Sequence, residues 1–381
     1  MDYPKRKLIM LPGPTNVPDR VMDAMIRPMI SHRGETFTSL LKSVTEKSRH
    51  LFQTTLDPVV LTASGTGGVE AAVWNLVRPG DKVVVPVFGE FSTRLAETVE
   101  LAGGEAIRVT SEFGTVPSRE AVEDAVNKAG NLKAVFIVHN ETSTGCAVPY
   151  IEQLAGTVRE KGAFYVVDAI SSLGGYAIPV DKWGVDVCIT GSQKCLAAPP
   201  GLSLLSMSKR TEEYVRKNPP KVRYFDLARQ LDFLAHGETP FTPAIPLYWA
   251  LDEALTMLVE EGLENRVERH AKHAKTFYSI LEAMGLKGFA DPKVRSNTVI
   301  SGLYPEGIDE KQFRKRMNEE YDIILGAGFG ALKARMFRIG NMGEVSTAHV
   351  HRTTAAMALT FKKFGYAVDL GRVSAVLEQA A

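Results

Sequence analysis

The sequence predicts an α/β protein: a large domain with a mostly parallel, mixed sheet covered by helices, followed by a smaller C-terminal α/β domain. Two observations carry this prediction. Between about residues 58 and 210, short apolar runs bounded by glycine or proline alternate with segments of helical periodicity, and such alternation is typical of helix-covered parallel sheets. Several of these runs are rich in Val and Ile without strict polar alternation, as expected of strands that are buried on both faces.

Seven strands and four helices account for the alternation. The expected strands are short apolar runs that end near a glycine, a proline or a polar residue. They are Val59–Ala63, Lys82–Val87, Ala106–Thr110, Ala134–His139, Phe164–Asp168, Asp186–Thr190 and Leu202–Ser206. The helices expected between them have apolar residues at helical spacing and are Gly67–Val77, Ser92–Ala102, Ser118–Lys128 and Tyr150–Lys161.

The rest of the chain predicts a second, smaller unit. Prolines interrupt residues 212–245, which we expect to be irregular. A long helical pattern then runs from Leu247 to Met284, with a kink expected at Gly262. The last expected elements are a strand Thr298–Leu303, a helix after Asp309, a glycine-rich turn at 326–330, a strand Met336–Ile339 and a helix from about Ala348. The predicted division is an N-terminal arm (1–15), a large domain (16–260) and a small C-terminal domain (261–381).

Composition narrows the classes of function. The 381 residues include 45 basic and 44 acidic side chains, a net charge of +1, and no sustained basic run. This balance argues against nucleic acid or an anionic membrane as a partner. Three cysteines without metal-ligand spacing predict no metal site and fit a reducing compartment. The apolar run at residues 8–11 is too short for a signal-peptide core, and no run approaches a membrane span, so we expect a cytoplasmic protein.

The most informative residues are Lys194, just beyond one predicted strand, and Asp168, at the end of another. Each has an ordinary alternative, a solvated loop lysine and a helix-capping aspartate. Together at the carboxyl ends of parallel strands, however, they are what pyridoxal phosphate (PLP) chemistry requires. The amine forms a Schiff base with the aldehyde, and the carboxylate keeps the pyridine nitrogen protonated.

A phosphate site is predicted where residues 63–68, Ala-Ser-Gly-Thr-Gly-Gly, follow a strand and open a helix. Successive main-chain amides at a helix N-terminus bind anions. Alone the motif is weak, because it lacks the ending of a nucleotide P-loop and the spacing of a dinucleotide fingerprint. A small-residue turn into a packed helix explains it equally well without the other residues.

These segments also form a family pattern. Residues 167–175 and 191–201 carry the aspartate and the lysine among small residues, and five further segments complete it: 11–15, 64–70, 139–145, 262–265 and 338–340. The pattern resembles the class V PLP-dependent aminotransferases of fold type I. The nearest branch is alanine–glyoxylate and serine–pyruvate aminotransferase, and the likeness covers essentially the whole chain.

The resemblance implies a role for each matching cofactor residue. Lys194 would hold the cofactor and shuttle the proton at Cα, and Asp168 would pair with the pyridinium nitrogen. An aromatic ring, here Phe91 where the family often has tryptophan, would stack on the pyridine, and Thr142 would lie near the phenolic oxygen. The phosphate would be held by Ser64, Gly65, Thr66 and Gln193.

The resemblance also implies substrate and subunit contacts. Arg338 would bind the substrate α-carboxylate with its guanidinium, and Gly13 would lie at the substrate. Thr239 and Thr242 fall in the segment through which a neighbouring subunit reaches the phosphate, which implies a homodimer with shared active sites. The sequence around them, Glu-Thr-Pro-Phe-Thr, departs from the tyrosine- and histidine-rich pattern of mammalian-type members, so the alignment there is open by a residue or more.

The expected reaction is ping-pong transfer of an amino group from alanine or serine to glyoxylate or pyruvate through a Lys194 Schiff base. Alternatives on the same fold stay open. They are a 2-aminoethylphosphonate or aspartate transaminase and a cysteine desulfurase or lyase. A dicarboxylate would ordinarily need a second cation, for which Arg33 and Lys333 are candidates, and desulfuration needs a mobile cysteine, which the 326–330 loop lacks. A non-catalytic subunit would have no need to keep lysine, aspartate and phosphate loop together.

Overall fold

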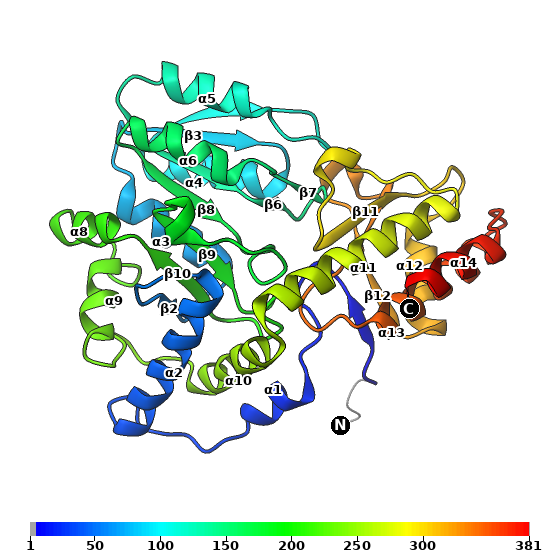
Figure 1. The fold of residues 1–381 in the computed structure, drawn as a ribbon, viewed down its shortest axis with the longest axis horizontal. Helices are drawn as coiled ribbons and strands as arrows, with labels where there is room; N and C mark the ends of the chain where they lie inside the picture. Colours follow the sequence, from blue (N-terminus) through cyan, green and yellow to red (C-terminus); the bar gives the residue numbers. More distant parts are fainter. Residues whose placement is uncertain (1–4, 381) are drawn as a thin grey trace.

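The computed structural model describes residues 5–380 and contains two main sheets, of seven and four strands (Figure 1). One large hydrophobic core surrounds the seven-stranded sheet, and a second core lies under the four-stranded sheet. A short hairpin of β6 (Asn140–Glu141) and β7 (Cys146–Ala147) lies apart from both sheets. The predicted α/β class is therefore confirmed.

The seven-stranded sheet has the order β2-β10-β9-β8-β5-β3-β4. Only β10 runs antiparallel to its neighbours, so the sheet is mixed and mostly parallel, as predicted. The observed bounds differ from the predicted ones by no more than one or two residues. They are β2 (Val59–Leu61), β3 (Lys82–Val87), β4 (Glu105–Thr110), β5 (Leu132–Val138), β8 (Phe164–Asp168), β9 (Val187–Gly191) and β10 (Ser203–Met207).

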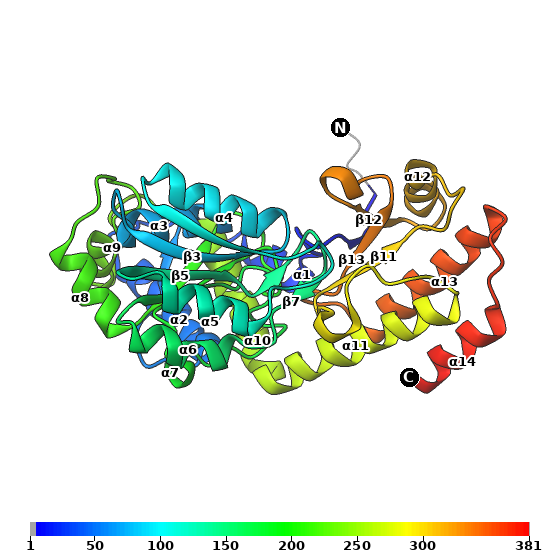
Figure 2. The ribbon, with the colours of Figure 1, turned by 90° about the horizontal axis from the view of Figure 1, so that it is seen from above.

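Helices cover both faces of this sheet (Figure 2). On one face lie α3 (Gly65–Leu76) and α4 (Glu90–Leu101), and on the other lie α5 (Arg119–Lys128), α6 (Ile151–Glu160) and the short α7 (Val180–Trp183). The four predicted helices are all present. Since the helices cover the two faces, ligands can reach the sheet at the carboxyl ends of the central strands β8 and β9.

The prediction that residues 212–245 are irregular was wrong, because two capped helices occupy part of this segment. They are α8 (Lys209–Lys217) and α9 (Leu227–Leu234). The Ser208 and Asp226 side chains accept hydrogen bonds from the third amide beyond each cap, which starts the helices. Pro219 and Pro220 follow the end of α8, and Pro240 and Pro243 lie beyond the end of α9, so the prolines fall outside both helices. Also unpredicted were α1 (Asp19–Ala24) and α2 (Glu35–Phe52).

The long helical pattern is broken into α10 (Ile245–Glu261) and α11 (Leu263–Ala283). The break falls at Gly262, the predicted kink, where a φ of 82° favours glycine over residues with a side chain. From this point α11 passes from the larger unit to the smaller one (Figures 1 and 2).

The four-stranded sheet has the order β1-β12-β13-β11 and contains the N-terminal segment. Strand β1 (Leu8–Met10) pairs in parallel with β12 (Ile323–Ala327). Strand β13 (Met336–Gly340) lies between β12 and β11 (Val299–Leu303) and pairs antiparallel with both. Strands β1 and β12 were not predicted. Around this sheet lie α12 (Glu310–Glu320), α13 (Thr347–Lys363), α14 (Leu370–Ala380) and the 3-10 turns η1 (Pro292–Val294) and η2 (Gly330–Leu332). The predicted boundary at residues 260–261 stays a prediction.

Within residues 5–380, no helix is long and apolar enough to span a bilayer. The same part of the chain holds no group of three or more His, Cys, Asp or Glu side chains arranged to bind a metal ion.

Candidate active site

A cavity of about 160 Å³ lies at the carboxyl ends of the central strands. It brings together eight of the predicted site residues from segments far apart in the sequence. They are Ser64, Gly65, Thr66, Phe91, Thr142, Asp168, Gln193 and Lys194.

Lys194 is buried in the turn that follows β9, with only 9% of its surface exposed. Its Nζ donates a hydrogen bond to the Pro12 carbonyl at 2.5 Å. Burial lowers the pKa of this amine to about 8, with a smaller contribution from the positive charge of Arg338. A substantial fraction of Lys194 is therefore a neutral base near physiological pH, as proton transfer requires.

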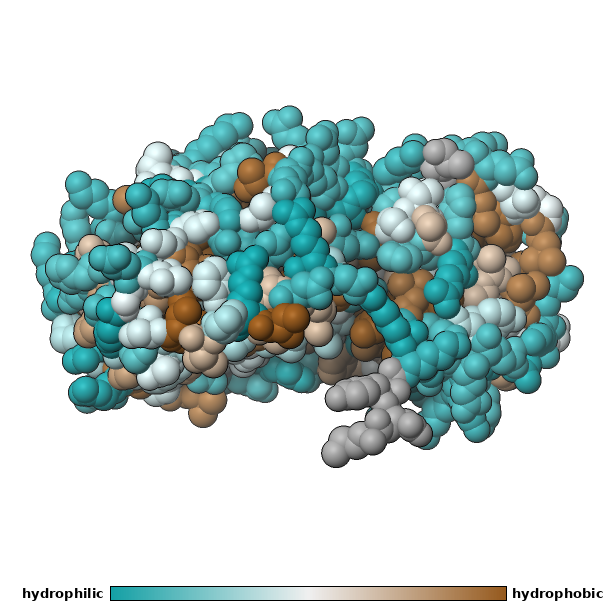
Figure 3. Space-filling model, turned by 90° about the horizontal axis from the view of Figure 1, so that it is seen from below, coloured by the Kyte–Doolittle hydropathy of each residue, from teal (hydrophilic) through white to brown (hydrophobic). Residues whose placement is uncertain are grey.

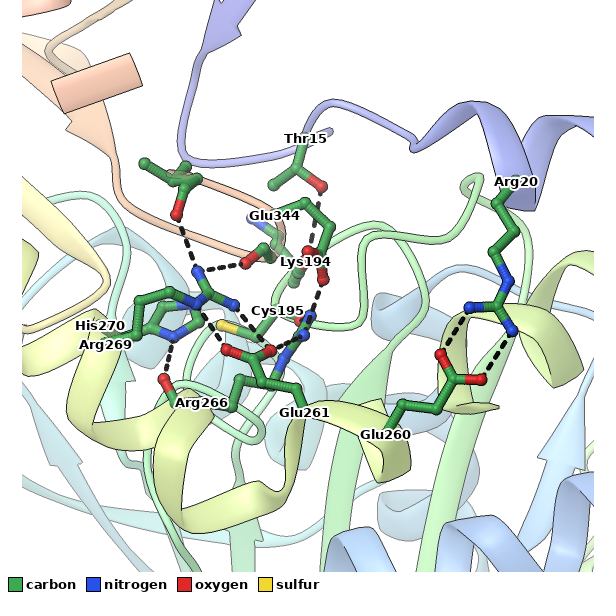
Figure 4. Close-up of polar contacts among 12 residues, drawn as sticks. Thr15, Arg20, Lys194, Cys195, Glu260, Glu261, Arg266, Arg269, His270 and Glu344 are labelled. Carbon is green, nitrogen blue, oxygen red and sulfur yellow. Dashed lines mark hydrogen bonds and ion pairs between the residues drawn. The ribbon is translucent and has the colours of Figure 1, made fainter. Parts of the chain in front are cut away.

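The segment after β1 crosses directly over this lysine. The Thr15 amide donates to the Gln193 carbonyl at 3.2 Å, and the Thr15 hydroxyl donates to the Lys194 carbonyl at 3.3 Å (Figure 4). Gly13 has a φ of 99°, and a Cβ there would lie 2.7 Å from Nζ of Lys194. Gly13 therefore contacts the Lys194 side chain, and any side chain at this position would displace it.

Asp168 ends β8, and its carboxylate faces the same cavity. Oδ1 accepts a hydrogen bond of 2.9 Å from the Ile170 amide. The enclosed position raises the pKa of the carboxyl to about 6, although the Ile170 amide and the Lys194 amine favour the ionised form. A half-buried carboxylate that faces a cavity without a full set of partners is ready to bind a cationic group.

The N-terminus of α3 forms the opposite wall of the cavity. Ser64 is its N-cap, no side chain caps the helix, and the first turn holds no acidic residue. The first amides of the helix, from Gly65 onward, therefore have no intrahelical partners and can donate to an anion. At Gly65 a Cβ would lie 2.8 Å from Ile170 Cδ1, so the main chain comes close to the cavity only because the residue is glycine.

Phe91 lies in the first turn of α4, and a buried carboxylate holds that turn. Glu141 is fully buried and accepts hydrogen bonds from the amides of Phe91 (3.3 Å) and Ser92 (2.9 Å). It also accepts from the Ser143 hydroxyl at 2.6 Å. Because these donors satisfy its oxygens, Glu141 fixes the first turn of α4, which carries Phe91, instead of acting in the cavity.

Arg338 lies on β13, at the side of the cavity formed by Thr142 and Phe91. Its Nη1 donates to the Thr142 carbonyl at 2.8 Å and its Nε to the Ala327 carbonyl at 2.7 Å. Its guanidinium carbon lies 4.5 Å from the centre of the Phe329 ring, which contacts Phe91 edge-on. Burial lowers the pKa of this guanidinium to about 10, so it is charged at neutral pH.

The residues present fit PLP. The cavity combines a buried amine, a carboxylate, an aromatic ring and an uncapped helix N-terminus, which match an aldehyde, a pyridine nitrogen, a planar ring and a phosphate. Two side-chain oxygens on its wall, Asn140 Oδ1 and Gln193 Oε1, are buried without a hydrogen-bond partner in the described part of the chain. Such atoms indicate that a polar ligand belongs there.

Four predicted residues are not among those that line this cavity. Arg338 and Gly13 contact lining residues, Thr142 and Lys194, whereas Thr239 and Thr242 lie in a separate pocket. Thr239 and Thr242 lie beside Tyr224 and Phe241, whose rings stack 5.1 Å apart. The Thr239 hydroxyl donates to the Phe241 carbonyl at 2.8 Å, which stabilises the local turn. Their predicted contact with the phosphate of a neighbouring subunit stays a prediction.

Several residues of the site were missed from the sequence. Arg94, Asn140 and Ser171 line the cavity. Arg94 follows Phe91 by three residues, so one turn of the predicted helix could have placed it on the same face. By contrast, Arg33 donates to Glu238 and to the Thr239 carbonyl, and neither it nor Lys333 lines the cavity.

Known proteins are similar to this chain in both sequence and fold. The family model described as aminotransferase class-V matches residues 10–354. An uncharacterized aminotransferase of Methanocaldococcus jannaschii is 42% identical over 380 residues, which cover 98% of this chain and 97% of that protein. Serine–glyoxylate aminotransferase of Methylorubrum extorquens is 37% identical over 358 residues, covering 90% and 88%. The crystal structure of ureidoglycine–glyoxylate aminotransferase from Bacillus subtilis has a TM-score of 0.93 at 29% identity and covers 99% of this chain and 98% of that one.

Proposed function

Because this chain belongs to the class V aminotransferases, which use PLP, we propose that it transfers the amino group of alanine or serine to glyoxylate or pyruvate. One observation carries the proposal. The hydrogen bonds that Arg338 makes within the described residues use Nε and Nη1. Nη2 is left to bind a substrate carboxylate next to Thr142, a residue of the cavity wall.

When bound, PLP supplies an aldehyde that condenses with amines and a ring that accepts the electron pair released at the substrate Cα. Lys194 is proposed to take the proton from Cα and to return it at the other end of the transfer. Its depressed pKa of about 8 keeps part of the amine neutral for this task. With PLP bound, Asp168 would pair with the pyridine nitrogen, the first turn of α3 would hold the phosphate, and Phe91 would pack against the ring.

The proposed acceptor rests on the relatives. Two of the aminotransferases described above are named for glyoxylate, with serine and ureidoglycine as the respective amino donors. A shared acceptor and varied donors support glyoxylate as the acceptor here. The amino donor differs between these two relatives, and the small cavity supports a small donor here.

An acidic donor such as aspartate is a second candidate, favoured by Arg94. Its guanidinium carbon lies 5.2 Å from the centre of the Phe91 ring, and the residue lines the cavity. It is therefore a second cation beside Arg338, although half of it is exposed and it pairs with Glu90 at 3.3 Å. A second carboxylate would be bound at this position.

Desulfuration gains no support from Cys195. Its thiol is fully buried, lies 3.7 Å from the Ser171 carbonyl and is outside the residues that line the cavity. Burial also raises its pKa to about 11, so it does not supply a thiolate. All three cysteines are free and buried, which agrees with a reducing compartment, and the cytoplasm is the proposed location.

The donor is identified by mixing the PLP-loaded enzyme with alanine, serine, aspartate or 2-aminoethylphosphonate singly, without an acceptor. Donors that convert the bound cofactor change its visible absorbance. We expect alanine or serine to do so and glyoxylate to reverse the change. A response to aspartate alone would identify the second candidate, and a response to 2-aminoethylphosphonate alone would reject both.

Arg338→Met is expected to raise KM for the donor and to lower kcat/KM by about 100-fold, because a charge-assisted contact to the carboxylate is lost. Arg338→Lys keeps the charge but not the planar guanidinium with its separate donors, and should recover only part of the loss. Steady-state kinetics check both variants. Arg335→Met, on an exposed side chain three residues earlier, is the control. Equal kcat/KM for Arg338→Met and the control would contradict this role.

We also propose a homodimer. Met22, Ile26 and Met29, in and just after α1, are 47%, 83% and 71% exposed. Figure 3 views the molecule from the side on which α1, α2 and α10 lie and shows separate hydrophobic groups on a mostly hydrophilic surface. Large apolar side chains gathered in one short segment support a contact with a second copy.

Light scattering after size-exclusion chromatography is expected to give twice the chain mass of 41.7 kDa. Ile26→Asp should shift the protein toward the monomer, because an unpaired carboxylate would be buried at the interface. Leu101→Asp is a matched control at another exposed apolar residue, which is 79% exposed. A wild-type monomer would reject the dimer, and a dimer unaffected by Ile26→Asp would exclude this segment from its interface.

A further inference from the structure

Arg266 is a fully buried arginine that none of the functions above uses. It lies in the first turn of α11, one helical turn after Gly262. Its guanidinium donates to three acceptors from three separate parts of the chain (Figure 4). They are the Cys195 carbonyl (2.8 Å), Glu261 Oε2 (2.7 Å) and Glu344 Oε1 (2.7 Å).

The first contact holds the main chain that carries Lys194. The turn that follows β9 is fixed at consecutive carbonyls: that of Gln193 by the Thr15 amide, that of Lys194 by the Ala197 amide, and that of Cys195 by Arg266. Since Lys194 precedes Cys195 directly, a shift of the Cys195 carbonyl would change the direction in which the lysine side chain leaves the main chain.

The contact with Glu344 holds the segment that follows β13. Glu344 lies four residues beyond the end of β13, the strand that carries Arg338. Arg269 strengthens this connection by donating to the Gly343 and Val345 carbonyls at 3.1 and 2.8 Å while it pairs with Glu261 at 2.6 Å. Glu261, at the end of α10, thus accepts hydrogen bonds from both Arg266 and Arg269 at the break between α10 and α11.

A buried charge of this kind is weak evidence for a role in stability. Removing a guanidinium from water is costly even when it is paired, and apolar side chains often fill such sites at least as well. Among the residues described, Nε of Arg266 has no hydrogen-bond partner, which adds to the cost. What apolar side chains cannot do is hold three acceptors in one fixed arrangement.

We infer that Arg266 is a positioning residue, which sets the placement of Lys194 relative to Arg338 by tying the Cys195 carbonyl to the segment that follows β13. The inference rests on the proposed function, because it assigns to these two residues the reacting amine and the substrate carboxylate. Both must be held within a fraction of an ångström, and misplacement by about 1 Å from a distant change lowers rates about 100-fold.

The test compares Arg266→Met with a matched control, Arg20→Met. Arg20 also forms an arginine–carboxylate pair beside α10, with Glu260 (Figure 4), but it is half-exposed and lies on the surface. For folded Arg266→Met we expect kcat/KM to fall 10- to 100-fold, with a rise in KM for the amino donor. Arg266→Lys should recover part of the loss, and Arg20→Met should match the wild type.

A second readout needs neither substrate nor cofactor. After removal of PLP, labelling of Lys194 with acetic anhydride across a pH series gives the pKa of its amine. Released from its fixed turn, the lysine should lose part of its burial and of its contact with the Pro12 carbonyl, so its pKa should rise from about 8 toward 10.5. Loss of global stability alone would not shift this pKa in the folded protein.

The two readouts separate this inference from the proposed reaction. If the wild type rejects alanine and serine, the proposed function fails, and the labelling still tests Arg266. A folded Arg266→Met protein with unchanged Lys194 pKa and kcat/KM would overturn the inference. If that variant does not fold, Glu344→Gln weakens only the contact to the segment after β13, and a change of about threefold in the same direction is expected. No change in Glu344→Gln would equally overturn the inference.

Discussion

Lys194→Ala is expected to lower kcat on the order of 10⁴-fold or more. The variant loses the amine that moves the Cα proton, and general acid–base catalysis by one placed group is worth about 10²–10⁴-fold. It also loses the amine that anchors the cofactor. The remaining contacts, in the first turn of α3 and at Asp168, should still bind PLP. The measurement is kcat of the purified, PLP-loaded variant, with bound PLP quantified separately.

A small amine added to the solution should restore part of the activity, because it can occupy the space that Lys194 vacates beside the Pro12 carbonyl. Lys128→Ala is the control, since the Lys128 side chain is 76% exposed and pairs with Asp124 across one turn of α5. A Lys194→Ala protein that still turns over within about tenfold of the control would remove the lysine from the mechanism.

Much of the large sheet could be predicted from the sequence because its strands are buried on both faces. Apolar runs such as Lys82–Val87 and Phe164–Asp168 are bounded by turn residues, and local composition is enough to identify them. The N-terminal strand Leu8–Met10 was not predicted, although it falls in the apolar run at residues 8–11, because that run lies outside the alternating segments. Its partner, β12, is more than 300 residues away, so only the tertiary structure shows that this short run completes a sheet.

The candidate site also contains residues that could be predicted from the sequence and residues that could not. Lys194, Asp168 and the turn at residues 64–66 could be predicted because their chemistry follows from strand ends and a helix start. Glu141 and Arg266 could not, because their roles are set by partners distant in sequence, at the start of α4 and at the Cys195 carbonyl. In a sequence, a charged residue that is buried looks the same as one on the surface until its hydrogen-bond partners are known.

Asp168→Asn is expected to stabilise the cofactor-free protein above about pH 6 and to impair the loaded enzyme. Folding raises the pKa of this carboxyl from 3.8 to about 6, mainly by burial. Between these values the folded state binds more protons than the unfolded state, so stability falls as the pH rises through this window. The loss is complete above it and amounts to up to about 3 kcal/mol, at about 1.4 kcal/mol per pH unit.

Asparagine removes the ionisation and keeps an oxygen for the Ile170 amide, which donates to Oδ1 in the wild type at 2.9 Å. The difference in free energy of unfolding between variant and wild type should therefore be small at pH 4 and reach about 1–3 kcal/mol at pH 8. Denaturant unfolding of the cofactor-free proteins at both pH values measures it. Asp124→Asn, at a carboxylate that is 57% exposed, is the control and should show no such rise.

The same substitution should lower kcat of the loaded enzyme by about 10²–10³-fold, because a preorganised charge opposite the developing charge of the ring is lost. A gain in stability together with a loss in activity is what distinguishes a functional carboxylate from a structural one. If Asp168 served only the fold, as a cap for the turn at Ile170, asparagine would preserve that hydrogen bond and kcat would stay near the wild type, whatever the change in stability. Asp168 would then have no part in the reaction, and the prediction that Asp168 and Lys194 act together on the cofactor would be wrong.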